Sequence, residues 1–334
     1  MSPKPTIKGR IVFEFLKKHP EMPTMTLAKL VYKKNANIFP TVNSARQLIK
    51  YYTGQNGKAA KKRIADKSLF RPEGPKNPFK DLPKGLKHFK NLNPYKIKGN
   101  SILVISDLHV PYHDLHALTL ALEYGIKHKV DTIVLLGDFV DFYGVSSFVR
   151  DPRKRKFKYE LEIIRKVFTT IASAFSNCEI VYLPGNHEYR YERWMLLKAP
   201  ELLDIDIFSM SHATGIDELN IKMLEPNKLI SIGRLSLLHG HELKGSGVLV
   251  NPARSAFLKG YENLLIGHHH RPSHHAEKTL TGKVLSCFSI GCLSNLQPDY
   301  APYNKYQHGF AHIQRTSAVD FIVNNKRIIN GEVF

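Results

Sequence analysis

Three apolar segments of strand length alternate with two helical segments between residues 101 and 185. The strand-like segments SILVIS, DTIVLLG and EIVYLPG begin at Ser101, Asp131 and Glu179, and the helical ones are LHALTLALEYGIKH and the stretch near residues 159 to 175. Strand, helix and strand in this order predict parallel pairing with a crossover helix. We therefore expect a mainly parallel sheet with helices packed against it.

Beyond this region the chain is rich in β-forming segments with fewer helices between them. The segments are LISIG, RLSLLHG, NLLIGH, KVLSCFSIG and GFAHIQ. Their composition and length are typical of strands, and we expect them to form a second sheet stacked on the first. The fold class predicted for residues 101 to 334 is thus α/β, with two stacked mixed sheets flanked by helices.

Residues 1 to 54 predict a small helical unit of a different kind. Apolar residues recur at helical spacing in three short segments, and Thr41 and Gly54 are suited to begin and end the third. The pattern resembles a helix-turn-helix DNA-binding domain, and a helical protein-interaction domain is the alternative. The outward face of the third helix is the candidate nucleic-acid surface, and it carries Ser44, Arg46, Gln47 and Lys50.

The N-terminal third also carries almost all of the net charge. Residues 1 to 100 contain 23 Lys and Arg against 5 Asp and Glu, a balance of +18 within a total of +20. Such a charge favours a polyanionic partner, because contact with phosphates releases condensed counterions. Nucleic acid is the predicted partner, with DNA favoured over RNA, and a solubilising or ribosome-adhesive tail is the alternative.

Residues 55 to 100 separate the two parts. Pro, Gly and Lys recur there and interrupt every periodicity, which predicts an extended basic linker. Aromatic residues in this stretch could instead fix it to the domain that follows, and the sequence leaves this open. These residues are Phe70, Phe79, Phe89 and Tyr95.

Composition bears on the cellular compartment. Three cysteines, Cys178, Cys287 and Cys292, are too few and too unpatterned for a disulfide framework in a chain of 334 residues. The chain has no apolar run of the roughly 20 residues that span a bilayer, and its start is not followed by a signal-peptide core. We expect a cytoplasmic protein without membrane contact. The oligomeric state is not predicted.

Polar motifs rich in Asp, His and Gly follow five of the predicted strands. Open α/β sheets bind ligands at the carboxyl ends of their strands, so the motifs are expected to meet in one site. One such motif arises easily by chance in a chain with 17 histidines, whereas five in this order do not. The motifs are Asp107-Leu-His109, Gly137-Asp138, Gly185-Asn186-His187-Glu188, His239-Gly240-His241 and Gly267-His268-His269-His270.

Together the motifs resemble the pattern of the calcineurin-like metallophosphoesterase superfamily: D-x-H, G-D, G-N-H-[DE], H and G-H-x-H. The resemblance spans about 165 residues. It implies an αββα sandwich over residues 101 to 334 and two divalent metal ions, Mn foremost and Fe, Zn or Ni as alternatives. By position, one metal would take Asp107, His109, Asp138 and His270, and the other Asp138, Asn186, His239 and His268.

Asp138 is the bridging and catalytic carboxylate in this assignment. In the D-x-H and H-x-H pairs, we expect an extended segment to point both side chains to the same side. The resemblance further implies that a hydroxide held by the metals attacks phosphorus and that His187 is the general acid. No covalent intermediate is required.

Other polar residues near the motifs have less certain roles in the predicted site. Glu188 is expected either to orient His187 or to hold its turn by hydrogen bonds. We expect His241 to lie near the leaving group and His269, between two ligands, to face away. Three arginines could clamp a phosphate, with a solvated surface position as the alternative for each. They are Arg190, Arg193 and Arg271.

Near the C terminus, the segment IGCLSNLQPDYAPYNKYQHGFAHI resembles the closing part of phosphoesterases encoded by bacteriophages and prophages. The predicted function is a metal-dependent phosphoesterase acting on nucleic acid, as a phosphodiesterase (nuclease) or an end-processing phosphatase, in a bacterial or phage-infected cell. One alternative is a phosphatase or cyclic-nucleotide phosphodiesterase acting on small molecules or phosphoproteins. The other, a non-catalytic DNA-binding protein, is disfavoured by the intact ligand set.

Overall fold

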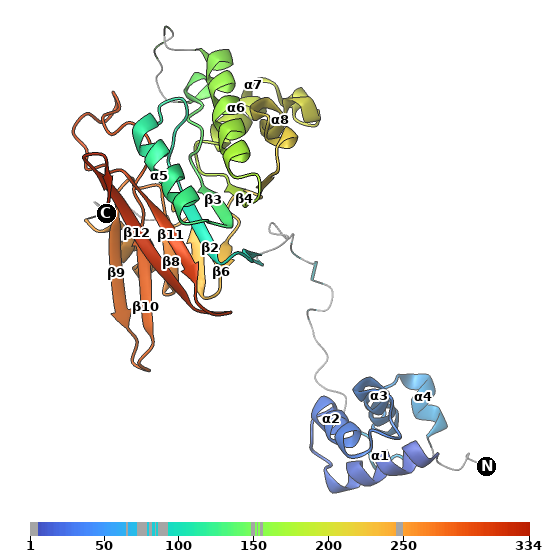
Figure 1. The fold of residues 1–334 in the computed structure, drawn as a ribbon. Helices are drawn as coiled ribbons and strands as arrows, with labels where there is room; N and C mark the ends of the chain where they lie inside the picture. Colours follow the sequence, from blue (N-terminus) through green and yellow to red (C-terminus); the bar gives the residue numbers. More distant parts are fainter. Residues whose placement is uncertain are drawn as a thin grey trace. The chain divides into compact units, whose positions relative to one another are not determined.

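The computed structural model describes residues 6–64, 66–71, 79, 82–83, 85, 93–147, 151, 153, 156–244 and 250–334. The chain divides into two compact units, Met1–Lys87 and His88–Phe334, and Figure 1 draws both.

The described part of the N-terminal unit is helical, as the apolar spacing predicts. Its helices are α1 (Ile7–Lys18), α2 (Thr24–Lys34), α3 (Val42–Tyr52) and the short α4 (Lys58–Arg63). The first three enclose a small core, because their apolar positions recur on one face of each helix. Its fully buried residues are Val12, Leu16, Leu27, Ala28, Val31, Phe39, Ala45 and Ile49.

Helix α3 begins with the expected cap. The hydroxyl of Thr41 accepts from the backbone N–H of Ser44 at 3.1 Å, and the hydroxyl of Ser44 donates to the carbonyl of Thr41 at 2.6 Å. Ser44, a predicted nucleic-acid contact, thus uses its hydroxyl within the helix end. Of the predicted surface, Gln47 is exposed and Arg46 and Lys50 are half-buried.

Both ends of the expected linker belong to folded units. Arg71 donates to the carbonyls of Pro20 and Met22 at 2.9 and 2.8 Å, which fixes the segment after α4 to the helical unit. At the other end, residues 93 to 100 lead into the C-terminal unit. Phe89 and most of the stretch between these ends lie outside the described residues.

The first sheet is built on the predicted βαβαβ run. Four strands pair in parallel, β2 (Ser101–Ile105), β3 (Thr132–Leu136), β4 (Glu179–Leu183) and β5 (Ile221–Met223). Three antiparallel strands extend the sheet on the other side of β2, namely β11 (Gly309–Arg315), β12 (Phe321–Ile329) and β13 (Glu332–Val333). The segment GFAHIQ therefore lies in the first sheet, and our expectation that it belongs to the second is wrong.

The second sheet has the strand order β1-β6-β7-β8-β10-β9. Its strands are β1 (Tyr95–Lys96), β6 (Ile230–Ile232), β7 (Leu235–Leu238), β8 (Asn263–Ile266), β9 (Ser273–Lys278) and β10 (Val284–Ser289). Strand β1 comes from the expected linker and pairs with β6 in parallel. Ile97, which follows β1, is buried in the core between the sheets.

Successive side chains along each strand of the first sheet point to opposite faces and are buried in two different cores. Ile102 and Val104 of β2 face the second sheet, whereas Leu103 and Ile105 pack against helices. The helices on this outer face are α5 (Leu115–Lys127), α6 (Phe157–Ala174) and α7 (Tyr189–Lys198) (Figure 1). Helix α9 (Pro252–Gly260) covers the outer face of the second sheet. The predicted fold class, two mixed sheets flanked by helices, is confirmed.

Short helical turns connect the larger elements. They are η1 (Tyr143–Val145), η3 (Pro200–Leu202), η4 (Asp206–Phe208), α8 (Met210–Thr214) and η5 (Ile216–Glu218). In the part of the chain that the structure describes, no helix is both long enough and apolar enough to cross a membrane.

Candidate metal centre

The five motifs lie directly after the carboxyl ends of strands in both sheets. Asp107 and His109 follow β2, Asp138 follows β3, and Asn186 follows β4, three parallel neighbours in the first sheet. The remaining motifs follow β7 and β8, which are parallel neighbours in the second. Parallel pairing brings these ends to a common edge, so the motifs converge as predicted.

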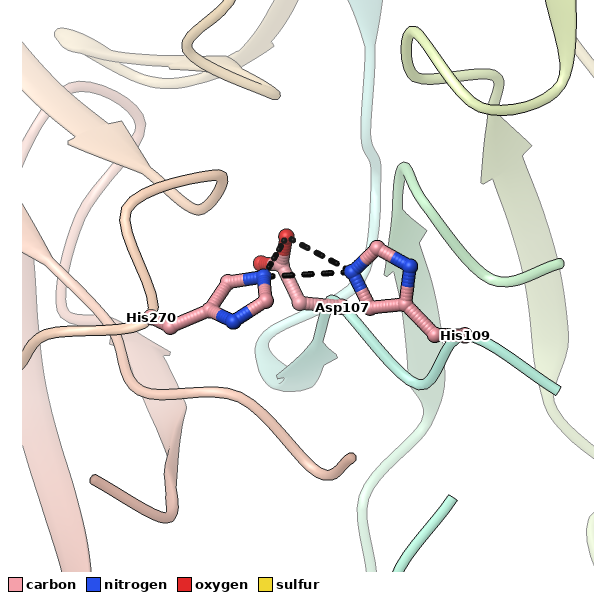
Figure 2. Close-up of side chains that lie close together, drawn as sticks. All are labelled: Asp107, His109 and His270. Carbon is pink, nitrogen blue, oxygen red and sulfur yellow. Dashed lines mark hydrogen bonds and ion pairs between the residues drawn. The ribbon is translucent and has the colours of Figure 1, made fainter. Parts of the chain in front are cut away.

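One group of potential ligands consists of Asp107, His109 and His270 (Figure 2). Oδ1 of Asp107 lies 3.2 Å from Nε2 of His270 and 4.0 Å from Nε2 of His109, and the two Nε2 atoms are 3.1 Å apart. All three side chains are buried. One carboxylate oxygen and two imidazole nitrogens thus converge on one point.

A second group consists of Asp138, His239 and His268. Oδ2 of Asp138 lies 3.2 Å from Nε2 of His239, and the rings of His239 and His268 are 5.2 Å apart between centroids. Asp138 also forms a third group, with His109 and His187. The carboxylate of Asp138 therefore connects the two predicted ligand sets.

Several buried atoms in this region lack a hydrogen-bond partner. They include Oδ1 of Asp107, Oδ1 of Asn186 and Nε2 of His239. Nδ1 of His239 lies 2.7 Å from the carbonyl of Leu136, which orients the ring with Nε2 toward Asp138. A metal bound there would replace the proton on Nε2. Unpaired buried acceptors of this kind are costly unless a cation binds them, so the donor set fits divalent metals that accept nitrogen and oxygen ligands.

The electrostatics of the site also favour bound cations. Burial raises the pKa values of Asp107 and Asp138, but the surrounding histidines lower them further, and both lie below their usual range. Burial lowers the pKa of His239, yet the carboxylates of Asp138 and Asp107 raise it to about 10. Burial and His239 lower the pKa of His268 to about 4. The two carboxylates therefore attract positive charge between them, and His268 stays neutral, as a ligand must.

Five of the candidate ligands have left-handed backbone conformations that non-glycine residues rarely adopt. The φ angles are 56° for Asp107, 49° for His109, 47° for Asp138, 66° for His268 and 54° for His270. Each position costs roughly 1 kcal/mol or more, and such strain concentrates at functional sites. Our expectation that extended segments orient the D-x-H and H-x-H pairs is wrong, because tight left-handed turns do so instead.

Sequence comparison identifies the family. The model of the family described as calcineurin-like phosphoesterase matches residues 101–313, well over half of the chain. The chain belongs to this family. The matched region runs from the first residue of β2 into β11 and contains all five motifs.

Two phage proteins and several solved structures are similar to parts of this chain. The gene 54 protein of Mycobacterium phage L5 is 26% identical over 227 residues, covering 63% of this chain and 87% of that protein. The gene 54 protein of Mycobacterium phage D29 is 24% identical over 208 residues, covering 59% and 80%. Among solved structures, vacuolar protein sorting 29 from Cryptosporidium parvum matches 71% of this chain and 95% of its own, at 14% identity and a TM-score of 0.39. The resemblance to phage proteins is confirmed.

Asp141 is a residue of the phosphoesterase site that the sequence analysis missed. Its Oδ2 lies 3.3 Å from Nδ1 of His187 and 3.4 Å from Nδ1 of His109. Burial raises the pKa of Asp141, but hydrogen bonds from the two imidazoles lower it below its usual range. By accepting both Nδ1 protons, this carboxylate fixes the orientation of the two rings. The available signal was an acid three residues after Asp138, in the sequence GDFVD.

Arg190 is fixed against the same pair of residues in the phosphoesterase domain. Its Nη1 donates to the carbonyl and to Oδ1 of Asp141 at 2.8 and 3.1 Å, and its Nη2 lies 2.9 Å from Nε2 of His187. Burial lowers the pKa of His187, Asp138 and Asp141 raise it, and Arg190 opposes them, with a net rise. Arg190 is therefore not the solvated surface arginine of the alternative prediction.

Glu188 holds the turns of two motifs together. Its Oε1 accepts from the backbone of Phe139 at 2.8 Å and of Val140 at 3.3 Å, and from the hydroxyl of Tyr182 at 2.6 Å. Its Oε2 accepts from the backbone of Gly185 at 2.7 Å and of Asp138 at 3.2 Å. Of the two roles expected for Glu188, these contacts match the structural one.

The other predicted residues lie at the margin of the phosphoesterase site. His241 has its Nδ1 3.5 Å from Oε2 of Glu242 and its ring 5.5 Å from that of His239. The ring of His269 is 5.0 Å from that of His268. Two arginines contact the chain locally. The exposed Arg193 donates to the hydroxyl of Ser147 at 3.2 Å, and the half-buried Arg271 donates to the carbonyl of Val250 at 3.0 Å.

Proposed function

We propose that this protein is a metal-dependent phosphoesterase that hydrolyses phosphoester bonds in nucleic acid. The observation that carries the hydrolytic part is the convergence of buried carboxylate and imidazole groups around Asp138, with unpaired acceptor atoms aimed inward. Membership of the calcineurin-like phosphoesterase family supports the reaction class.

The ligand sets follow from the groups around Asp138. One cation would be held by Asp107, His109, Asp138 and His270, and the other by Asp138, Asn186, His239 and His268. Mn²⁺ is the proposed metal, with Fe, Zn and Ni as alternatives, because each accepts mixed nitrogen and oxygen ligands. When bound, the two cations would polarise the phosphoryl oxygens and lower the pKa of the attacking water.

His187 is the proposed general acid. Asp141 accepts the proton on Nδ1, so Nε2 is the atom that can carry a proton to the departing oxygen. Nη2 of Arg190 lies 2.9 Å from the same atom and donates to it when it is unprotonated, so a proton on Nε2 requires Nη2 to turn to another acceptor, such as a phosphate oxygen. A phosphate oxygen that approaches Nε2 therefore also meets a fixed cation, which supports Arg190 as a substrate contact.

The distribution of charge supports nucleic acid as the substrate. Residues 1 to 100 carry +18, which leaves +2 for the remaining 234 residues, so the cationic surface belongs mainly to the helical unit. A tethered basic module raises the local concentration of phosphodiester bonds around a nearly neutral catalytic domain. Within this unit, Arg46, Gln47 and Lys50 of α3 are the proposed contacts.

A metal and substrate screen tests the catalytic proposal. Chelated protein is supplied in turn with Mn²⁺, Zn²⁺, Ni²⁺ or Mg²⁺ and assayed on methyl p-nitrophenyl phosphate, p-nitrophenyl phosphate, DNA and RNA. We expect metal-dependent hydrolysis of the diester by the wild type and none by Asp138→Asn. Hydrolysis of the monoester alone, without nucleic-acid cleavage or removal of terminal phosphates from it, would instead support a small-molecule phosphatase.

Affinity measurements test the role of α3. The double variant Arg46→Ala/Lys50→Ala removes two cations from the predicted surface, and Lys8→Ala/Arg10→Ala removes two exposed cations from α1. We expect the α3 variant to bind DNA at least about tenfold more weakly and to lower the slope of log affinity against log salt by about 2. An equal loss in both variants would mean that α3 makes no particular contact.

A further inference from the structure

Helix α7 places an uncommon set of side chains beside the candidate ligand Asn186. One face of this helix lines a cavity of about 290 Å³, together with Asn186 and the segment after η1. The helix residues on this face are Tyr189, Arg190, Arg193, Trp194, Leu197 and Lys198. Three of them are cationic, and none of the described residues that line the cavity is acidic.

The aromatic side chains of this face are available to a ligand. Tyr189 is 51% exposed and Trp194 is 36% exposed, whereas Tyr191 and Met195 of the same helix are buried in the core. The helix is therefore anchored without these two rings. Exposed aromatic rings interleaved with cations are the groups that bind unpaired bases and their phosphates.

A second cavity, of about 360 Å³, begins two residues after the candidate ligand His109. It too combines aromatic rings with cations, and Tyr143 of η1 forms part of its wall. Val145, at the other end of η1, lines the α7 cavity, so this short turn separates the two. The lining residues are Pro111, Tyr112, Tyr143, Arg153, Lys156, Tyr159 and Glu160.

The pairing of cavities suggests what the site holds. A phosphodiester carries a substituent on each side of its phosphorus, and here one aromatic, cationic cavity adjoins Asn186 and another adjoins the segment after His109. A phosphomonoester would use only one of them. In a duplex the faces of the bases are covered by stacking, so rings such as Trp194 and Tyr143 can reach only unpaired bases.

We propose that the two cavities are nucleotide subsites on either side of the scissile phosphate, and that the substrate is therefore a single-stranded stretch of polynucleotide. This proposal rests on the phosphodiesterase function proposed above. Trp194 and Tyr189 stack on the base at one subsite, and Tyr112 and Tyr143 on the base at the other. Arg193 contacts the adjoining backbone phosphate.

The sequence provides a local probe of the first subsite. Trp194 is the single tryptophan of the chain, so fluorescence excited in tryptophan reports on the α7 cavity and not on the basic helical unit. The full-length protein is titrated with oligo(dT), oligo(rU) and a blunt DNA duplex of equal length, while a labelled oligonucleotide reports total binding by anisotropy. Comparison of oligo(dT) with oligo(rU) distinguishes DNA from RNA.

We expect single strands to quench the fluorescence of Trp194, and the duplex to need at least about tenfold higher concentration for half-maximal quenching. Arg193→Ala should raise the concentration for half-maximal quenching about tenfold. The control is Arg254→Ala, at an exposed arginine on α9 outside both cavities, and it should leave this concentration unchanged. No quenching at concentrations where anisotropy shows saturation, or equal quenching by duplex, would overturn the proposal.

Kinetics keep this proposal separate from the proposed function. Trp194→Ala and Tyr143→Ala should each lower kcat/KM for the oligonucleotide about tenfold more than kcat/KM for methyl p-nitrophenyl phosphate, mainly through KM. An equal loss on both substrates would refute the subsites and leave the phosphoesterase intact. Failure of the wild type to hydrolyse the small diester with any metal would refute the phosphoesterase, whereas quenching of Trp194 by single strands would still identify a binding site.

Discussion

Substitution of Glu188 by glutamine should destabilise the C-terminal unit, although the shape of the side chain hardly changes. The carboxylate accepts two backbone N–H groups on each oxygen, and a hydroxyl from Tyr182 on one of them. The amide of glutamine has only one oxygen, which can accept from one pair of backbone N–H groups. Its NH₂ group must face the other pair, which then has no acceptor. Each buried N–H without an acceptor costs about 1 to 3 kcal/mol, so the Glu188→Gln variant should lose about 4 kcal/mol.

Urea unfolding followed by Trp194 fluorescence measures this loss, because the single tryptophan lies in the C-terminal unit. The measurement is made with a chelator present, since bound metal would stabilise both proteins by mass action. The control is Glu162→Gln, an exposed glutamate on α6, which should change stability by less than about 0.5 kcal/mol. A Glu188→Gln variant within about 1 kcal/mol of wild type would refute the structural role that we assign to this carboxylate.

Three further predictions concern the ligand set, a glycine and a buried acid. Asp138→Asn should lose both metal and turnover, whereas His187→Asn should keep its metal and have a kcat about 10² to 10⁴ lower. Mass spectrometry of the eluted ions measures the metal content. Equal metal loss in the two variants would contradict these roles. Gly137→Ala should lose metal and more than about 2 kcal/mol of stability, because its φ is 82° and its Cβ would overlap the imidazole of His239. Gly282→Ala, at φ 87° and with only an ordinary contact to Lys278 at 3.9 Å, should cost only about 1 kcal/mol. Equal costs would show that the overlap is relieved. Burial raises the pKa of Glu160 to about 7, so the stability that its protonated form contributes is complete below about pH 4.5 and is lost as pH rises through 7. Between pH 5 and pH 8, urea unfolding should show the stability of Glu160→Gln rising by up to about 3 kcal/mol relative to wild type. Parallel stability profiles of the two proteins would contradict this.

Parts of the fold that follow from local periodicity could be predicted from the sequence. The strands β2, β3 and β4 and the helices between them were predictable because burial on both faces and helical spacing leave a direct trace in residue type. Strand β1 could not be predicted, since two residues, Tyr95 and Lys96, carry no periodicity. The placement of β11 was wrong because its partner, β2, lies about 200 residues earlier, and composition does not specify a partner.

The site was predictable to the extent that strand ends fix it. Parallel strands bring Asp107, Asp138 and Asn186 to one edge, whatever the loops do afterwards. Asp141 was missed because its contact with His187 depends on the path of the loop after β3. The left-handed turns at the ligands were likewise hidden, since Asp and His do not signal a positive φ as glycine does.

The position of β11 has a consequence for how the protein is made. Strand β2 lies in the middle of its sheet, between β3, which leaves the ribosome about 30 residues after it, and β11, which emerges about 200 residues later. During translation, one edge of the apolar segment Ile102–Ile105 therefore has no native partner until Gly309–Arg315 has been made. Chains that stop before Gly309 would expose that edge permanently and be prone to associate with one another.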